Sequence, residues 1–131
     1  MRFNLTDLNP GTVCPLDPSD PSAGSVTLRT LNTETLADIE RKTRTLRVEY
    51  RRGQRHEVVD VNEALHSELL WDYAIVAWDG IEDENGVPIP CTRENKATLM
   101  NGSPVFARIV GDLLDQLTEA RIQRAESAEK N

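Results

Sequence analysis

The amino-acid sequence predicts a mainly α-helical single domain with a minor β-strand and hairpin element and an extended N-terminal arm. Its 131 residues, of which 38% are hydrophobic, allow one hydrophobic core of ordinary domain size. Four segments carry apolar residues at helical spacing, and four of the seven prolines fall within the first 24 residues. We therefore divide the chain into an arm at 1–24, a mainly helical domain at 25–122 and a polar tail at 123–131.

The arm begins with a candidate strand at residues 2–8 and continues through a proline-rich stretch. Proline lacks a backbone N–H and blocks regular helix, so the arm is predicted to run extended over the surface. The next segment, residues 25–31, alternates Val26 and Leu28 with polar side chains. This alternation predicts a half-buried strand at the start of the domain.

The first helix is predicted at residues 33–43. Asn32 or Thr33 provides a side-chain oxygen that can cap its first turn, and Glu34 follows within that turn. Lys42 lies near its end, where the helix dipole favours a positive charge. Capping and charge therefore agree on both limits of this helix.

A β-hairpin is predicted next. Residues 46–50 alternate apolar and charged side chains, Arg52-Gly53 can form a turn, and residues 56–61 provide the second strand. After the hairpin, apolar residues from 61 to 79 form one broad helical stripe, which predicts a central core helix. Asp60 is its predicted N-cap and Gly80 its C-terminal stop. The stripe comprises Ala64, Leu65, Leu69, Trp71, Tyr73, Ile75, Val76 and Trp78.

A tight β-like loop is predicted at residues 81–90. Its Asn85-Gly86 pair favours a type I′ turn, and Pro88 leaves few backbone donors for a regular ladder. Two helices complete the domain. Thr92 caps a short helix at 92–101, and Ser103-Pro104 begins a longer one at 104–122, since proline suits the first helical position.

The composition excludes several classes of protein. No run of about 18 apolar residues is present to span a membrane, and the first residues lack the apolar stretch of a signal peptide. Cys14 and Cys91 are far apart and form no CxxC pair, which is typical of a reducing compartment. We therefore expect a cytoplasmic protein with two free thiols and no membrane partner.

The charge of the chain is unevenly distributed. Residues 41–55 contain seven basic side chains and one acidic one, a net charge of +6, which leaves −13 elsewhere in a chain whose total is −7. An acidic total argues against nucleic acid as a partner, because that affinity comes from neutralising phosphates. The basic segment predicts either a surface for an acidic partner or a solvated hairpin whose arginines discourage edge-to-edge pairing.

The residues offer little for catalysis or cofactor binding. His56 and His66 fall in no zinc or hydrolase motif, and no glycine-rich loop is present to hold a phosphate. The acidic turn at 79–86 does not fit a calcium loop, because Ile81 and Thr92 occupy the first and twelfth ligand positions. We expect no enzyme activity, no cofactor and no metal, so the function should lie in binding surfaces.

The predicted working surface surrounds the aromatic part of the 61–79 helix and the loop that follows it. Tryptophan is a typical anchor of protein interfaces, and a proline-bounded turn offers contact area that is already ordered. Core packing is the alternative interpretation for both tryptophans. The predicted protein-binding residues are Trp71, Trp78, Asp79, Gly80, Ile81, Asn85, Gly86 and Pro88.

Three short segments carry a resemblance to a known family. They read AIVAWDGI at 74–81, DENGVPIP at 83–90 and TREN at 92–95. Together they resemble the tail assembly chaperones of long-tailed phages and prophages, in which a Trp-acid-Gly-Ile step, an Asp-x-x-Gly-x-Pro turn and a capped helix follow one another. The resemblance covers about half of the chain. Ile89-Pro90-Cys91 departs from it, because the family more often has phenylalanine at the third position.

The resemblance implies a protein that binds the tape-measure protein and helps recruit tail-tube subunits during tail morphogenesis. It also implies that the protein works in the host cytoplasm and is absent from the mature virion. A virion structural or head-tail completion protein is the alternative, and a regulatory subunit or nucleic-acid-binding repressor that uses residues 41–55 is a second one. The sequence leaves the oligomeric state open.

Overall fold

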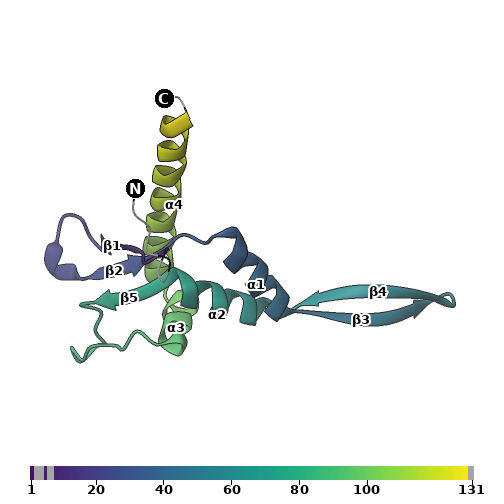
Figure 1. Ribbon diagram of the computed structural model, residues 1–131. Helices are drawn as coiled ribbons and strands as arrows, with labels where there is room; N and C mark the ends of the chain where they lie inside the picture. Colours follow the sequence, from purple (N-terminus) through teal and green to yellow (C-terminus); the bar gives the residue numbers. More distant parts are fainter. Residues whose placement is uncertain (2–4, 6–7, 130–131) are drawn as a thin grey trace.

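A three-stranded antiparallel sheet packed against the helices forms the body of the protein, and a long two-stranded hairpin extends away from it (Figure 1). The computed structural model describes residues 1, 5 and 8–129. The candidate strand at 2–8 therefore lies almost wholly outside the described residues. The elements in chain order are β1 (Thr12–Pro15), the 3-10 helix η1 (Pro21–Ala23), β2 (Ser25–Leu28), α1 (Thr33–Thr43), β3 (Arg44–Arg51), β4 (Gln54–Val61), α2 (Glu63–Ala74), β5 (Ile75–Asp79), α3 (Arg93–Gly102) and α4 (Pro104–Glu129).

The predicted mainly α class is wrong. Helix accounts for 48% and strand for 26%, and the strands form two antiparallel sheets, so the protein is a small mixed α/β domain. β1 and β5 lie where the sequence predicts an extended arm and a helix, whereas the predicted hairpin supplies most of the strand content.

The body sheet has the strand order β1-β2-β5, with β2 in the centre. Residues 12–15 of the predicted arm pair antiparallel with β2, so this part of the arm contributes an edge strand to the sheet. β5 pairs antiparallel with the other edge of β2, with a register irregularity between Thr27 and Leu28. Val26 and Leu28 are fully buried at the centre of the core, as their alternation predicts.

The predicted core helix at 61–79 is wrong in its last five residues. α2 ends at Ala74, and residues 75–79 form β5 instead. Ile75 and Val76 are β-branched and Trp78 is aromatic, which are the residue types that favour a pleated surface. The free edge of β2 supplies the backbone partners, so pairing with a distant strand overrides the local helical spacing. The cap also moves, because Asn62 rather than Asp60 accepts from Leu65 N.

The other helix starts are confirmed. The side chains of Asn32 and Thr92 accept backbone N–H groups at the first turns of α1 and α3. α4 begins at Pro104, and Ser103 Oγ accepts from Phe106 N at 3.2 Å. The end of α4 differs, since the helix continues to Glu129 rather than 122. Phe106 and Val110 on α4 complete the core with the sheet and Met100 of α3.

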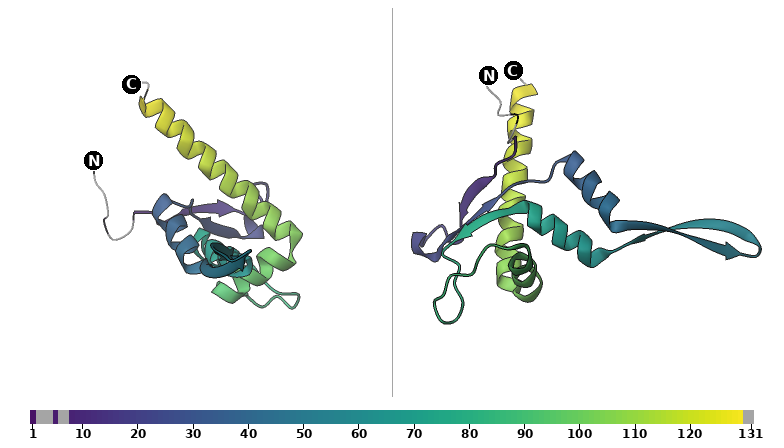
Figure 2. Two further views of the ribbon diagram at one scale, coloured as in Figure 1. Left: turned by 90° about the vertical axis from the view of Figure 1, so that its right-hand side faces the viewer. Right: turned by 60° about the horizontal axis from the view of Figure 1, so that its bottom comes forward.

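The β3–β4 hairpin is confirmed and projects as a ribbon beyond α1 and α2 in Figure 1 and in the right-hand view of Figure 2. Its strands pair over their full length, from Arg44 opposite Val61 to Arg51 opposite Gln54. Arg52 and Gly53 both have positive φ, at 53° and 76°, which is the signature of a type I′ turn. At the base, Asn62 N donates to Thr43 O at 2.8 Å, so the hairpin enters and leaves the body at one place.

The predicted type I′ turn at Asn85-Gly86 is wrong. Gly86 has a φ of 77°, but Asn85 does not adopt a positive φ. Gly86 N donates to Asp83 O at 3.0 Å, so the reversal begins at Asp83 and Gly86 provides the left-handed residue that follows. The predicted β-like loop is present, with an isolated antiparallel bridge between Glu82 and Pro88.

Gly80 does not end a helix, as was predicted, but follows a strand. It follows β5 with a φ of 76°, and a Cβ placed on it would lie 2.8 Å from Gly24 Cα. Gly24 itself has a φ of 105° and precedes β2. Two glycines therefore allow the ends of β2 and β5 to touch backbone to backbone, which sets where the 81–90 loop leaves the sheet.

Candidate protein-binding surfaces

The eight residues predicted to bind protein lie on α2, on β5 and in the connection that follows β5. Trp71, Trp78 and Ile81 are half-buried and pack against the core cluster. The other five residues, Asp79, Gly80, Asn85, Gly86 and Pro88, are exposed. Of the eight residues predicted to bind protein, three therefore pack against the core and five are accessible to a partner.

Trp78 connects the loop to the last helix. Its Nε1 donates to Ile89 O at 2.7 Å, and its ring meets Phe106 edge to face, with centroids 6.0 Å apart and planes at 87°. Such pairs contribute about 0.5 to 1.5 kcal/mol beyond the area they bury. The indole thus has its polar atom satisfied and its ring packed, which favours a structural task for Trp78 beneath the binding surface.

The 81–90 loop is held by its own backbone at both sides. Ile89 N donates to Ile81 O at 2.9 Å, and the adjacent residues Glu82 and Pro88 form an antiparallel β-bridge. Because Ile81 packs against the core, these bonds hold the loop on the body. Val87 near its tip is 55% exposed. The loop therefore presents an apolar side chain on a backbone that is already ordered.

The tip and the end of the loop are fixed by side-chain hydrogen bonds. Asp83 Oδ1 accepts from Asn85 N at 2.8 Å and from Val87 N at 3.0 Å. Asn95 of α3 donates from Nδ2 to Pro90 O at 2.9 Å. The turn and the capped helix of the sequence resemblance are thus joined in space, and the carboxylate of Asp83 is used to order the backbone.

A second candidate surface lies on the hairpin, and the sequence analysis did not identify it. Alternation along paired strands places five apolar side chains on one side, where Arg44, Arg55 and Glu57 also lie. We call these five the apolar hairpin face: Leu46, Val48, Tyr50, Val59 and Val61. All five are exposed, from 43% for Val48 to 73% for Tyr50. The apolar alternation predicted the hairpin itself, but nothing local shows whether its apolar side is covered by the body.

The opposite side of the hairpin is polar and internally paired. Arg47 Nε bonds to Asp60 Oδ2 at 2.6 Å, Arg47 also pairs with Glu49, and Arg51 reaches Glu49 at 2.9 Å. The hydrogen bond from Arg47, followed by that from Arg51, holds the pKa of Glu49 below its usual value. Several arginines of the basic segment therefore pair within the hairpin.

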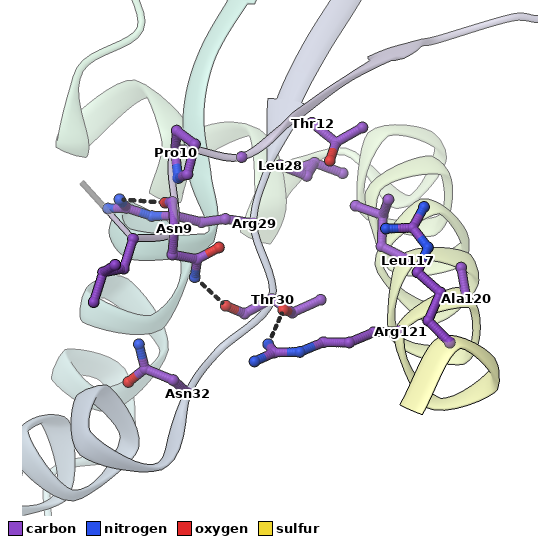
Figure 3. A pocket seen from close by; sticks show the side chains of 13 residues that line it. Asn9, Pro10, Thr12, Leu28, Arg29, Thr30, Asn32, Leu117, Ala120 and Arg121 are labelled. Atoms are coloured by element: carbon purple, nitrogen blue, oxygen red, sulfur yellow. Dashed lines mark hydrogen bonds between the residues drawn. The ribbon is translucent and has the colours of Figure 1, made fainter. Parts of the chain in front are cut away.

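A groove of about 490 Å³ lies between the N-terminal segment, the end of β2 and α4 (Figure 3). Arg29 dominates its floor, but its guanidinium stacks 3.8 Å from the centroid of the Tyr73 ring and its Nε donates to Tyr73 O at 2.6 Å. Asn9 Nδ2 donates to Thr30 O, and Arg121 donates to Thr30 Oγ1. These polar groups connect three segments of the chain, so the groove serves the fold.

Reactive side chains in the described part of the chain are dispersed. Burial raises the pKa of both the Cys14 and Cys91 thiols, so the helix N-terminus that follows Cys91 does not produce a thiolate there. Among the described residues, no three His, Cys, Asp or Glu side chains gather in a way that could hold a metal ion. Nor does any described helix combine the length and apolar character needed to cross a bilayer.

Comparison with known proteins assigns the chain to a family. The family model described as YdaY prophage protein matches residues 31–131, which include the hairpin, the 81–90 loop and α4. No curated protein and no solved structure matches the chain. The match supports the prophage origin implied by the sequence resemblance but does not extend to tail assembly. Because it covers well over half of the residues, the chain belongs to the YdaY prophage protein family.

Proposed function

We propose that this prophage protein is a tail assembly chaperone, which binds the tape-measure protein and helps recruit tail-tube subunits in the host cytoplasm. Two observations support the proposal. The family places the chain among prophage proteins, and the segments that resemble tail assembly chaperones form one continuous structural unit from β5 through the 81–90 loop to α3. In this role the protein holds another protein and carries out no reaction.

The 81–90 loop is the observation that carries the proposal. Trp78, Asp83 and Asn95 hold its backbone, so that little conformational entropy is lost when a partner binds. Val87 and Pro88 lie exposed on this ordered support. A preordered apolar projection of this kind suits a groove between helices or an apolar stripe on the partner.

The charge around the loop indicates what the partner segment should look like. Asp79, Glu82, Asp83 and Glu84 lie in or beside the loop and are exposed. A partner helix with an apolar stripe flanked by lysine or arginine would be attracted and oriented by this field. A partner with an acidic flank would be repelled, so the loop should discriminate among segments of the tape-measure protein.

Co-expression with the tape-measure protein tests this function. Val87→Lys changes the exposed apolar projection without touching the bonds that hold the loop, and it should weaken binding about tenfold or more. The fraction of tape-measure protein that remains soluble is the measurement. Wild type should keep it soluble, and Val87→Lys should release it to the pellet.

Ile122→Lys provides a matched control. Ile122 is 53% exposed, close to the 55% of Val87, and it lies on the distal part of α4 rather than on the loop (Figure 1). This variant should retain full chaperone activity. If both variants lose the same amount of soluble tape-measure protein, the loop is not the binding site. If wild type never keeps the tape-measure protein soluble, the chaperone assignment is wrong.

A virion structural or head-tail completion protein is the alternative function. It would remain in finished particles and would form stable rings, whereas a chaperone leaves before the virion is complete. Immunoblotting of purified particles separates the two. Detection at a stoichiometric level in mature virions would favour the structural function over the proposed one.

A further inference from the structure

The hairpin projects from the body in the right-hand view of Figure 2. All five side chains of the apolar hairpin face are exposed. Leu46 is 69% exposed and Tyr50 is 73% exposed. An isolated two-stranded hairpin is marginally stable in water, and monomers rarely expose a contiguous apolar patch larger than a few hundred Å². The hairpin therefore needs a cover that the described part of the chain does not provide.

This face runs directly into a pocket at the base of the hairpin. The pocket has a volume of about 400 Å³, and Val59 and Val61 belong both to it and to the apolar hairpin face. Glu40 and Glu63 lie at its rim with Arg44, so two acidic groups face one basic group. Among the described residues, neither glutamate forms an ion pair.

The opposite end of the same hairpin is basic. Arg52 occupies the turn, and Arg55 lies beside it at the start of β4, where its nearest carboxylate is Glu57 at 3.9 Å. Both arginines are exposed. Glu57 lies on the same side, opposite Val48 and next to Arg55. The surface thus runs from a basic tip with one acidic neighbour through an apolar stretch to a pocket lined by two glutamates, and this order of charges is complementary to itself when reversed.

We propose that this surface binds a second copy of the same chain, in a two-fold dimer whose apolar hairpin faces pack antiparallel. The basic tip of each hairpin then enters the acid-rimmed pocket of the other, and every contact occurs twice, as in isologous interfaces. The inference does not depend on tail assembly or on the tape-measure protein.

Charge and length select the antiparallel arrangement. A parallel stack would place Arg52 and Arg55 against their own counterparts, and like charges across an interface are unfavourable. Strands of eight residues span about 26 Å, so two fully overlapping hairpins bring each tip to the base of the other. Two packed ribbons also reproduce the spacing of about 10 Å between sheets in β-sandwiches.

The apolar contact is tested by light scattering on purified full-length protein over a dilution series. Leu46→Lys places a charge within the apolar hairpin face, opposite Val59, and should raise the dimer dissociation constant about tenfold or more. Thr45→Lys is the matched control, because Thr45 lies one position away on the polar side, opposite Asp60. It should leave the dimer intact.

The charge contact is tested by reversal at both ends. Arg55→Glu and Glu40→Arg should each weaken the dimer, because each places like charges at both contact sites. An equimolar mixture of the two variants should dimerise again, since the Glu at 55 in one chain then meets the Arg at 40 in the other, while Arg55 meets Glu40 at the second site. A change confined to folding within one chain cannot produce this rescue between chains.

Three results would overturn the proposal. The first is a wild type that stays monomeric at every concentration. The second is a dimer that is equally stable in Leu46→Lys and Thr45→Lys. The third is a Leu46→Lys variant that loses only the tape-measure protein in co-expression, which would assign the apolar hairpin face to a different partner.

Discussion

At the scale of single residues, Trp78 was predicted to be an interface anchor, but its contacts in the structure are with its own chain. Its N–H donates to Ile89 and its ring packs on Phe106. Trp78→Ala should therefore lower the free energy of unfolding by about 2 kcal/mol or more. Trp78→Phe, which keeps a ring but loses the hydrogen bond, should cost about 1 kcal/mol. Urea unfolding measures both, and an unchanged Ala variant that fails only in partner binding would restore the anchor interpretation.

The contact between Gly24 and Gly80 gives a second prediction. Gly80→Ala places a methyl group 2.8 Å from Gly24 Cα at a φ of 76°, so it should destabilise the protein by about 1 to 3 kcal/mol. Gly111→Ala is the same substitution in the interior of α4, with no heavy atom within 4 Å of the new carbon, and it should stabilise by about 1 kcal/mol. Thermal melts of both variants should shift in opposite directions.

The two thiols give a prediction that depends on pH. Because burial raises the pKa of both Cys14 and Cys91 above the ordinary value of 9.0, the thiolate fraction of each at neutral pH is smaller in the native protein than in the unfolded chain. Iodoacetamide should therefore label the native chain much more slowly than the urea-unfolded chain at pH 7, since the thiolate is the nucleophile. Mass spectrometry follows the labelling. Rapid modification of native Cys91 at pH 7 would contradict the raised pKa.

At the scale of elements, the type I′ geometry of the hairpin turn can be tested by substitution. Arg52 adopts a left-handed conformation with φ of 53°, which asparagine tolerates better in a type I′ turn. Arg52→Asn should therefore stabilise the hairpin by about 1 kcal/mol, which would slow hydrogen exchange of the β3 and β4 amides. Gly53→Ala, at a φ of 76°, should accelerate it. Faster exchange in the asparagine variant would exclude the type I′ geometry.

At the scale of the whole molecule, the hairpin leaves and rejoins the body at one place, where Thr43 O accepts from Asn62 N. Because the core cluster contains no hairpin residue, a chain in which two glycines replace residues 44–61 should still fold. Its melting temperature should lie within about 5 °C of that of the dilute wild-type protein.

The same deletion variant separates folding from dimerisation. Its melting temperature should be independent of protein concentration, whereas that of wild type should rise with concentration, because dimerisation stabilises the native state by mass action. Circular dichroism melts over a dilution series measure both. Loss of the folded body on deletion would show that the hairpin is needed for the core.

Local chemistry determined much of this protein from the sequence alone. The starts of α1, α3 and α4 follow from Asn32, Thr92 and Ser103-Pro104, because a cap satisfies backbone groups within one turn of itself. The hairpin follows from the alternation of apolar and charged residues on both sides of Arg52-Gly53, because a two-residue turn also acts over a short range. The β-like loop at 81–90 was also predicted, since its proline and glycine act on their immediate neighbours.

Only the tertiary structure decided the features that depend on distant partners. Residues 75–79 carry helical spacing as well as strand-forming side chains, and the free edge of β2, some fifty positions earlier, selects the strand. The same strand turns Trp78 inward, so its task was not readable from the sequence. The exposure of Leu46 and Tyr50 is equally non-local: alternation shows that one hairpin face is apolar, but only the path of the whole chain leaves that face uncovered.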